Sequence, residues 1–263
     1  MNDSLRIAVA QTDAPPESHD EALAMLERTV EGAPGADLIV LPELALCGYG
    51  DAERVRRLAI PQASEFIDRV RALAGHAGKG FIAGYAEQAD GVLYNSALAV
   101  GPEGTIRGNY RKVNLWGPHE RALFTPGTPS PIMPWDGLRL GMLICYDLEF
   151  AEAARDLVLR GADTLIVISA TSRPYSVVPD ILVPARGYEN GCHVVYANVV
   201  GRDATYDFIG MSRITAPDGS VLAAAPDTGA AIIEAKLDRA TVTAWRVGHD
   251  YLADRRSDLY RLV

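Results

Sequence analysis

Hydrophobic positions in the first half of the chain follow two different spacings. Continuous apolar runs at 5–10 and 38–41 predict buried strands; the first ends at Gln11 and the second is stopped by Pro42. Apolar residues spaced by three or four positions predict helices, which glycine closes. The remaining elements predicted in this half are, in chain order, a helix over 21–30, a helix over 66–77, a strand over 81–86 and a hairpin of 92–101 with 104–113.

The second half of the chain repeats this alternation. A strand over 138–144 leads directly into Cys145. Pro179 and Pro184 predict a late start or a kink in a helix over 177–190. We expect the polar tail over 245–260 to be irregular. The other elements predicted in this half are a helix over 150–160 and strands over 161–170, 192–201, 208–216 and 230–237.

Two predicted strand segments, GADLIVLPE and GADTLIVISA, resemble each other. Each follows a helix that ends in glycine, and each places a distinctive residue at the carboxyl end of its strand. Strands alternating with helices indicate an α/β fold, and short turns such as 217–219 add antiparallel strands, which makes the sheet mixed. With no linker or low-complexity segment in the sequence, we expect a single domain over residues 1–263.

Ligands of open α/β sheets bind beyond the carboxyl ends of the strands. Glu43, Cys145 and the stretch from Ser169 to Thr171 all lie at such ends in the predicted arrangement. We therefore expect these three strand ends to meet in one crevice, which turns attention to their chemistry.

Composition excludes several other classes of protein. The chain has 263 residues, of which 48% are hydrophobic, enough for a substantial core. Its formal net charge is −9 and its pI about 5.1, and it has no basic run, so we expect no nucleic-acid partner. No apolar run is long enough to span a bilayer, and the N-terminus reads as a strand rather than a signal peptide. We expect no membrane partner.

The cysteines fit a reducing compartment. Cys47, Cys145 and Cys192 are odd in number, widely spaced and without a CxxC pair, so a disulfide framework is not expected and a cytoplasmic location is. Cys47 and Cys192 are interpreted as core residues. The sequence contains no GxSxG, no phosphate-binding GK[ST] loop and no HExxH, and we expect neither a metal nor an organic cofactor.

Cys145 needs a base if it is a nucleophile, since the thiolate attacks carbonyl carbon and a free thiol has a pKa of about 8.5. Glu43 follows a proline at the end of a buried strand, where desolvation raises a carboxyl pKa towards that of a general base. Lys112 ends the predicted hairpin, where an ammonium can hold an oxyanion and favour the thiolate. Taken singly, each has an ordinary alternative: a small buried filler, a charge at a helix N-terminus and a solvated hairpin lysine.

Three segments, LPELALCGY, YRKVNL and GMLICYDLEF, closely resemble the signature segments of the nitrilase superfamily of carbon–nitrogen hydrolases. The similarity runs from IAVAQ near the start to HDYLADRR near the end. The resemblance implies a triad of Glu43 as general base, Lys112 as stabiliser of the tetrahedral intermediate and Cys145 as nucleophile. It also implies a role for Glu120, which resembles a second glutamate of the family; the alternative for Glu120 is a pair with Arg121 or Lys112.

The same resemblance implies a four-layer α-β-β-α sandwich whose subunits pair through helices, as a homodimer or a larger even-numbered oligomer. The segment YRKVNL departs from the family by placing Asn114 where relatives often have histidine, a change expected to affect the loop and not the triad. Arg186 and Glu189 are interpreted as a structural ion pair. The predicted substrate-binding residues are Tyr49, Trp116, Tyr146 through its backbone N–H, Ala170 and Thr171, with Tyr175 as a further candidate for the wall.

The function predicted from these residues is hydrolysis of a small amide to the acid and ammonia. A nitrilase is one alternative. Nitrilases typically follow the cysteine with tryptophan and glutamate, whereas this chain has CYD, as amidases and carbamoylases do. An N-carbamoyl hydrolase is another and needs an arginine for the substrate carboxylate, for which Arg173 or Arg202 could serve. A non-enzymatic binding or scaffold protein is the alternative from another class. The stretch 170–180 matches no subfamily pattern, so the identity of the amide stays open.

Overall fold

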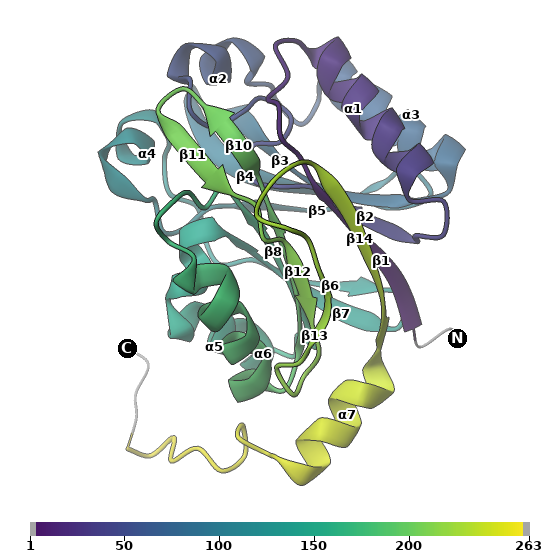
Figure 1. The fold of residues 1–263 in the computed structure, drawn as a ribbon, viewed down its shortest axis with the longest axis vertical. Coiled ribbons are helices and arrows are strands. Elements are labelled where there is room, and N and C mark those ends of the chain that lie inside the picture. The colour runs from purple at the N-terminus through teal and green to yellow at the C-terminus, as the bar shows by residue number, and fades with distance from the viewer. Residues whose placement is uncertain (1–3, 260–263) are drawn as a thin grey trace.

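The computed structural model describes residues 4–259 and contains two six-stranded mixed sheets stacked face to face (Figure 1). The strands of the first sheet, in spatial order, are β14 (Ala231–Asp238), β1 (Ser4–Gln11), β2 (Leu38–Val40), β3 (Gly80–Ala89), β4 (Val92–Val100) and β5 (Ile106–Arg111). Those of the second sheet are β13 (Val221–Ala224), β12 (Arg213–Thr215), β9 (His193–Asn198), β8 (Thr164–Ser169), β7 (Leu138–Ile144) and β6 (Ile132–Trp135).

Helices cover the outer face of each sheet, so the layers run helix, sheet, sheet, helix, as the resemblance implied (Figure 1). Helices α1 (His19–Gly32) and α3 (Glu65–Ala77) lie on the first sheet, and α5 (Ala151–Leu159) and α6 (Val183–Asn190) lie on the second. A separate hairpin of β10 (Val200–Asp203) and β11 (Tyr206–Ile209) projects beyond the strand ends. The other helices of residues 4–259 are α2 (Ala52–Leu58), α4 (Gly117–Leu123) and α7 (Arg239–Gly248).

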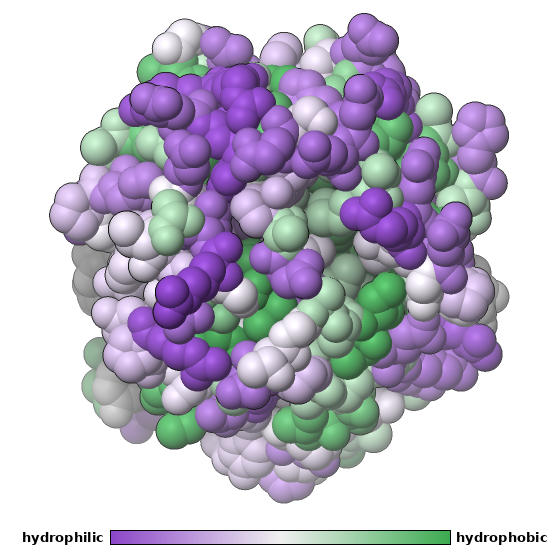
Figure 2. All heavy atoms as spheres, turned by 45° about the horizontal axis from the view of Figure 1, so that its top comes forward, coloured by the Kyte–Doolittle hydropathy of each residue, from purple (hydrophilic) through white to green (hydrophobic). Residues whose placement is uncertain are grey.

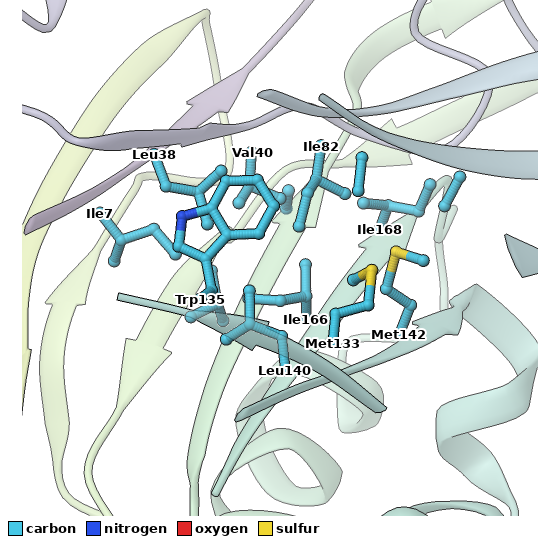
Figure 3. Packing of buried hydrophobic residues seen from close by; sticks show 14 of the residues in the cluster. Ile7, Leu38, Val40, Ile82, Met133, Trp135, Leu140, Met142, Ile166 and Ile168 are labelled. Atoms are coloured by element: carbon cyan, nitrogen blue, oxygen red, sulfur yellow. The ribbon is translucent and has the colours of Figure 1, made fainter. Parts of the chain in front are cut away.

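Strand alternation distributes apolar side chains between two kinds of core. In β2, Leu38 and Val40 point into the space between the sheets, whereas Ile39 packs beneath the helices. Figure 3 shows the inter-sheet core, where Trp135, Leu140 and Ile166 of the second sheet face residues of the first. Since both faces of β2 are buried, its sequence reads as a continuous apolar run and not as an alternating one.

The two similar segments of the sequence occupy equivalent places in the fold. Strand β2 is the middle of a parallel group formed with β1 and β3, and β8 is the middle of a parallel group formed with β7 and β9. All other strand pairs in the two sheets are antiparallel, including the predicted β4–β5 hairpin. The carboxyl ends of each parallel group therefore lie at one edge, where ligand sites are expected.

Three sequence predictions need correction. The run 208–216 is not one strand, because Gly210 and Met211 both take left-handed φ angles, of 61° and 58°, and separate β11 from β12. The run 192–201 likewise divides into β9 and the start of β10. The tail over 245–260 begins inside α7, whose first turn is capped by the Asp238 carboxylate accepting from the backbone N–H of Ala240 at 2.7 Å.

The helix over 177–190 shows the break that its prolines predict, with a π-helical turn at Val178–Leu182 leading into α6. Short elements escaped the sequence analysis, namely α2, α4, β6 and β13. Within residues 4–259, no helix is long and apolar enough to cross a membrane. The face shown in Figure 2 is largely hydrophilic, with hydrophobic residues visible in a central hollow and towards the lower part of the view.

Candidate active site

The carboxyl ends of four strands meet in one region of the molecule. Glu43 follows β2, Lys112 follows β5, Cys145 follows β7, and Thr171 lies two residues beyond β8. Lys112 lies within hydrogen-bonding distance of Glu43, and the Cys145 sulfur lies 3.8 Å from the Thr171 hydroxyl. Tyr49 links the two pairs, because its hydroxyl bonds the Glu120 carboxylate that Lys112 also contacts and its side chain lines one cavity with Cys145 and Thr171, so the predicted convergence of strand ends is present in the structure.

The turn that carries Glu43 packs unusually closely on the neighbouring strand. The backbone N–H of Gly84, in β3, donates to the carbonyl of Pro42 at 3.1 Å. A Cβ atom on Gly84 would lie 2.2 Å from the backbone nitrogen of Leu44, so only glycine permits this approach. Leu44 itself takes a left-handed φ of 50°, which turns the chain away after Glu43. This geometry holds the Glu43 side chain inside the molecule.

Lys112 is shared between two buried carboxylates. Its ammonium donates to Glu43 Oε1 at 2.8 Å and to Glu120 Oε1 at 2.7 Å, and none of the three side chains reaches solvent. Glu120 therefore pairs with Lys112 and not with Arg121. It is held further by the Tyr49 hydroxyl, which donates to Oε1 at 2.6 Å, and by the backbone N–H of Trp116, which donates to Oε2 at 2.9 Å.

Two polar positions of this cluster have no partner among residues 4–259. An ammonium has three N–H donors, and Lys112 uses two of them on Glu43 and Glu120, so the third remains for another acceptor. Glu43 Oε1 also accepts from the Asn95 side-chain amide at 2.6 Å, whereas Glu43 Oε2 is buried without a hydrogen bond. Buried polar atoms are normally satisfied, so this site offers one donor and one acceptor to a reacting molecule.

Cys145 occupies a strained backbone position between a strand and a turn. Its φ is 49°, in the left-handed region that non-glycine residues seldom occupy, and it begins the 3-10 turn Cys145–Glu149. Strain of this kind is concentrated at functional sites. The buried carboxylate of Asp147 fixes the turn, since it accepts from the Ile144 N–H at 3.1 Å and from the Tyr110 hydroxyl at 2.7 Å.

Asp147 also connects the cysteine turn to the loop after Lys112. It accepts from the backbone N–H of Asn114 at 2.8 Å and from the Asn114 side-chain amide at 2.9 Å. Asn114 thus shapes the loop, as the sequence predicted. Because one carboxylate bonds both segments, Lys112 and Cys145 are held in a fixed relation to each other.

Burial dominates the electrostatics of the site. Desolvation by burial raises the pKa of Glu43, and Lys112 opposes that rise. Burial acts against the charge of Lys112, but Glu43 and Glu120 outweigh it, so the pKa of Lys112 is raised well above its usual value. Burial, followed by the Glu43 charge, raises the pKa of the Cys145 thiol to about 12. Lys112 does favour the thiolate, as expected, but the balance leaves Cys145 protonated at neutral pH.

Cys145 opens into a small cavity of about 50 Å³. Four of the predicted substrate-binding residues meet there, since Tyr49, Trp116, Ala170 and Thr171 all line it, as does Tyr175. The full lining consists of aromatic and small residues with one carboxylate: Tyr49, Trp116, Cys145, Glu149, Ala170, Thr171, Ser172, Tyr175 and Tyr206. A cavity of this size suits a small acyl group.

Other predicted residues lie outside this lining. The Tyr146 ring packs against Phe150, with centroids 4.9 Å apart, so its side chain does not form the wall and only its backbone N–H is left as a contribution. Arg173 and Arg202 do not line the cavity, and Arg173 instead lies 3.7 Å from an oxygen of Asp207. The carboxylate-binding arginine of an N-carbamoyl hydrolase is therefore not found among the lining residues.

The structural interpretations of four other residues are confirmed. Cys47 and Cys192 are fully buried in the core, and burial raises the pKa of each thiol to about 12. Arg186 forms the predicted ion pair with Glu189 at 3.1 Å. Among residues 4–259, no group of three or more His, Cys, Asp or Glu side chains is arranged to hold a metal ion.

Sequence reasoning missed several residues that shape the site. Asn95 bonds Glu43 from the middle of β4, and Asp203 of the β10–β11 hairpin accepts from the backbone N–H groups of Tyr49 and Gly50 at 2.9 and 2.8 Å. Tyr206 of the same hairpin and Glu149 line the cavity. Only Glu149 carried a usable signal, because it lies in the same short turn as Cys145.

Comparison with known proteins identifies the family and its fold. A carbon–nitrogen hydrolase family model matches residues 6–247. An (R)-stereoselective amidase from a Pseudomonas species is 36% identical over 222 residues, which cover 84% of this chain and 80% of the relative. A nitrilase from Pyrococcus abyssi is 33% identical over 264 residues, which cover 97% of this chain and 99% of the relative.

The solved structures agree with these matches. The amidase of Nesterenkonia AN1, from the nitrilase superfamily, superposes with a TM-score of 0.82 at 30% identity, covering 98% of this chain and 97% of that one. In one variant of that amidase the acetamide moiety of fluoroacetamide is added covalently at the active-site cysteine, and another variant is in complex with butyramide.

Fold and matches together define a nitrilase-superfamily hydrolase of the amidase and nitrilase type. The chain belongs to the carbon–nitrogen hydrolase family. It is therefore an enzyme that hydrolyses carbon–nitrogen bonds other than peptide bonds, and the alternative of a non-enzymatic binding or scaffold protein is set aside.

Proposed function

We propose that this enzyme hydrolyses a small carboxylic amide to the acid and ammonia through a thioester on Cys145. One observation carries the proposal: the ammonium of Lys112 lies fully buried between Glu43 and Glu120 beside the cavity that Cys145 lines. Three buried ionised groups are costly unless they serve a purpose. Acyl transfer supplies that purpose, because it needs a base, a nucleophile and a cation at the developing oxyanion.

The first half of the reaction forms the thioester. Glu43 takes the thiol proton as the Cys145 sulfur attacks the amide carbon, so no free thiolate needs to accumulate. The free N–H of Lys112 and the backbone N–H of Tyr146 hold the oxyanion. Glu43 then passes its proton to the amide nitrogen, the carbon–nitrogen bond breaks, and ammonia leaves.

The second half releases the acid. Glu43 takes a proton from water as the water oxygen attacks the thioester carbon. Lys112 again holds the oxyanion, the carbon–sulfur bond breaks, and the sulfur recovers the proton from Glu43. Glu120 keeps Lys112 charged and in place, because it supplies the second carboxylate that the ammonium contacts. Glu120 itself transfers no proton.

Two chemistries on the same residues are weaker candidates. A nitrile gives a thioimidate, which needs addition of water and expulsion of nitrogen, and the turn after Cys145 resembles amidases rather than nitrilases. An N-carbamoyl amino acid brings a carboxylate, and the cavity lining includes no arginine or lysine to receive it.

Release of ammonia from matched panels of amides, ureido acids and nitriles tests the proposal. Turnover of nitriles faster than amides contradicts it.

Hydroxylamine provides a test of the covalent intermediate. A thioester is intercepted by any good nucleophile that arrives before water. We expect propionamide or butyramide to yield hydroxamic acid together with the carboxylic acid, with the hydroxamate share rising in proportion to hydroxylamine concentration. Colorimetric detection of the hydroxamate and a parallel assay of ammonia measure the partition. Hydrolysis without any hydroxamate at high hydroxylamine, in a site that still admits small amides, contradicts the thioester route.

We further propose a homodimer, or a larger even-numbered assembly with closed symmetry, that pairs through α5 and the helix over 178–190. Apolar side chains are exposed along this face, including Leu159, Val177, Tyr188 and Ile181, of which Ile181 is 58% exposed. Light scattering at micromolar concentration is expected to give at least twice the mass of 28.3 kDa. Ile181→Asp is expected to shift the population towards monomer, and a monomeric wild-type protein refutes this assembly while leaving the chemistry untouched.

A further inference from the structure

Glu149 is the one charged residue in the lining of the Cys145 cavity, and the proposed reaction does not use it. It ends the same 3-10 turn that Cys145 begins. Four steps along such a turn, at about 2.0 Å per residue, place the two residues roughly 8 Å apart. A small substrate whose carbonyl carbon reaches the Cys145 sulfur can therefore extend towards the Glu149 carboxylate.

The Glu149 carboxylate has no hydrogen bond or ion pair within the part of the chain that the structure describes. The two cations whose charges act on it are Lys112 and Arg186. Lys112 is engaged by Glu43 and Glu120. Arg186 donates to the backbone carbonyls of Leu148 and Glu149, and to the carboxylate of Glu189. Glu149 is an exposed residue, so its negative charge lies at the mouth of the cavity, in contact with solvent and without a direct counter-ion.

Aromatic rings form the rest of the wall around this charge. Trp116 lies with its ring centroid 6.3 Å from that of Tyr175 and 6.4 Å from that of Tyr206, and Tyr206 contacts Tyr49 edge-on at 5.2 Å. The faces of aromatic rings attract cations, and an ammonium is the group that aromatic walls with a carboxylate bind best. Burial raises the pKa of Glu149 above its ordinary value, as expected of a carboxylate that lacks a partner.

We propose that the natural substrate is a small amide with a protonated amine on its acyl part, held by Glu149 and by the rings of Trp116, Tyr175 and Tyr206. This inference rests on the proposed function and names its substrate class. A neutral amide fits the same cavity but makes no ion pair with this carboxylate, which then keeps only water as its partner. An amide with a second carboxylate is disfavoured, because two like charges would meet at the mouth of a small cavity.

Alaninamide and isobutyramide provide a matched pair, because an ammonium in one replaces a methyl group of similar size in the other. The quantity compared is the ratio of kcat/KM for alaninamide to kcat/KM for isobutyramide, at neutral pH. Glu149→Gln is expected to lower this ratio at least tenfold, and Glu149→Lys to lower it further and to improve turnover of succinamate. Glu152→Gln serves as a control for long-range charge, since Glu152 is exposed nearby on α5 and does not line the cavity.

The comparison of variants separates this inference from the chemistry beneath it. A ratio that stays within twofold of wild type in Glu149→Gln, or that falls equally in Glu152→Gln, overturns the ammonium site while amide hydrolysis stands. A wild-type enzyme that turns over no amide of any charge overturns the proposed function, and the inference with it. If Glu149→Gln is unstable, calorimetric binding of alaninamide and isobutyramide to Cys145→Ala decides the matter, with tighter binding of alaninamide expected and equal binding contradicting the site.

Discussion

Cys145→Ala is expected to abolish amide turnover while leaving the fold intact. The covalent route is lost with the sulfur, so the rate of ammonia release should fall by roughly 10⁴-fold or more. The stability cost is small, because the side chain is only partly buried where it packs against the inter-sheet core. Loss of one sulfur costs about 1 kcal/mol, which corresponds to a change in Tm of about 2–4 °C for a chain of this size.

The other two cysteines supply matched controls. Cys47 and Cys192 are more deeply buried than Cys145, and neither lines the cavity. Alanine at either position should therefore cost more stability than at Cys145, yet at least a tenth of the activity should remain. An active Cys145→Ala enzyme refutes the mechanism. Equal loss of activity in all three variants would attribute the effect to packing and not to the nucleophile.

Convergence of Glu43, Lys112 and Cys145 was predictable from the sequence because each ends a strand. Apolar runs locate strands, and the carboxyl ends of parallel strands lie at one edge of a sheet. The signature segments supplied the roles that spacing could not. Exposure then decides between those roles and the ordinary alternatives, since Lys112 has no contact with solvent and thus is not a solvated hairpin lysine.

Residues that support the site from distant segments were not predictable from local pattern. Asn95 lies in the middle of β4 and contacts Glu43 across 52 positions of sequence. The sequence pattern did not reveal the β10–β11 hairpin. The apolar runs 192–201 and 208–216 each continue past the point where the chain passes between the sheet and the hairpin, so neither run shows a break there. An apolar pattern reports burial and not the direction of the chain. A segment that stays buried as it turns from a sheet into a hairpin over the site therefore remains one continuous apolar run.

Glu43→Gln is expected to lower kcat/KM by roughly 10²–10⁴-fold, the range that follows loss of a general base. Glutamine keeps the shape of the side chain, and its oxygen can still accept from Lys112 and Asn95, so the packing around the turn is preserved. What is lost is the ability of Oε2, which has no hydrogen-bond partner among residues 4–259, to take the thiol proton. The acyl-enzyme cannot form rapidly without that transfer, because the Cys145 thiol has its pKa raised to about 12.

The pH dependence of kcat/KM distinguishes a lost base from a damaged site. Glu43 works only when ionised, and burial raises its pKa above the ordinary 4.5, so wild-type activity should fall as the pH falls through that raised value. At moderately alkaline pH no loss is expected from Lys112, whose pKa is raised well above its usual value. In Glu43→Gln the acid limb assigned to Glu43 should disappear while the residual rate stays low.

Alkylation completes the test of Glu43. Mass spectrometry should show that fluoroacetamide still modifies Cys145 in Glu43→Gln, although more slowly than in the wild type. The small fraction of thiolate attacks the carbon that bears fluorine, fluoride leaves, and the thiol proton goes to solvent; because this alkylation is irreversible and needs no proton for a leaving amine, it goes to completion without the base. A variant that is neither alkylated nor active has lost the site, and its rate says nothing about the base. Turnover near the wild-type rate with an unchanged acid limb would instead move the base to Glu120 or His119, both of which lie close to Tyr49. Lys112 would then still bind the oxyanion, but Glu43 would not be the acceptor of the thiol proton.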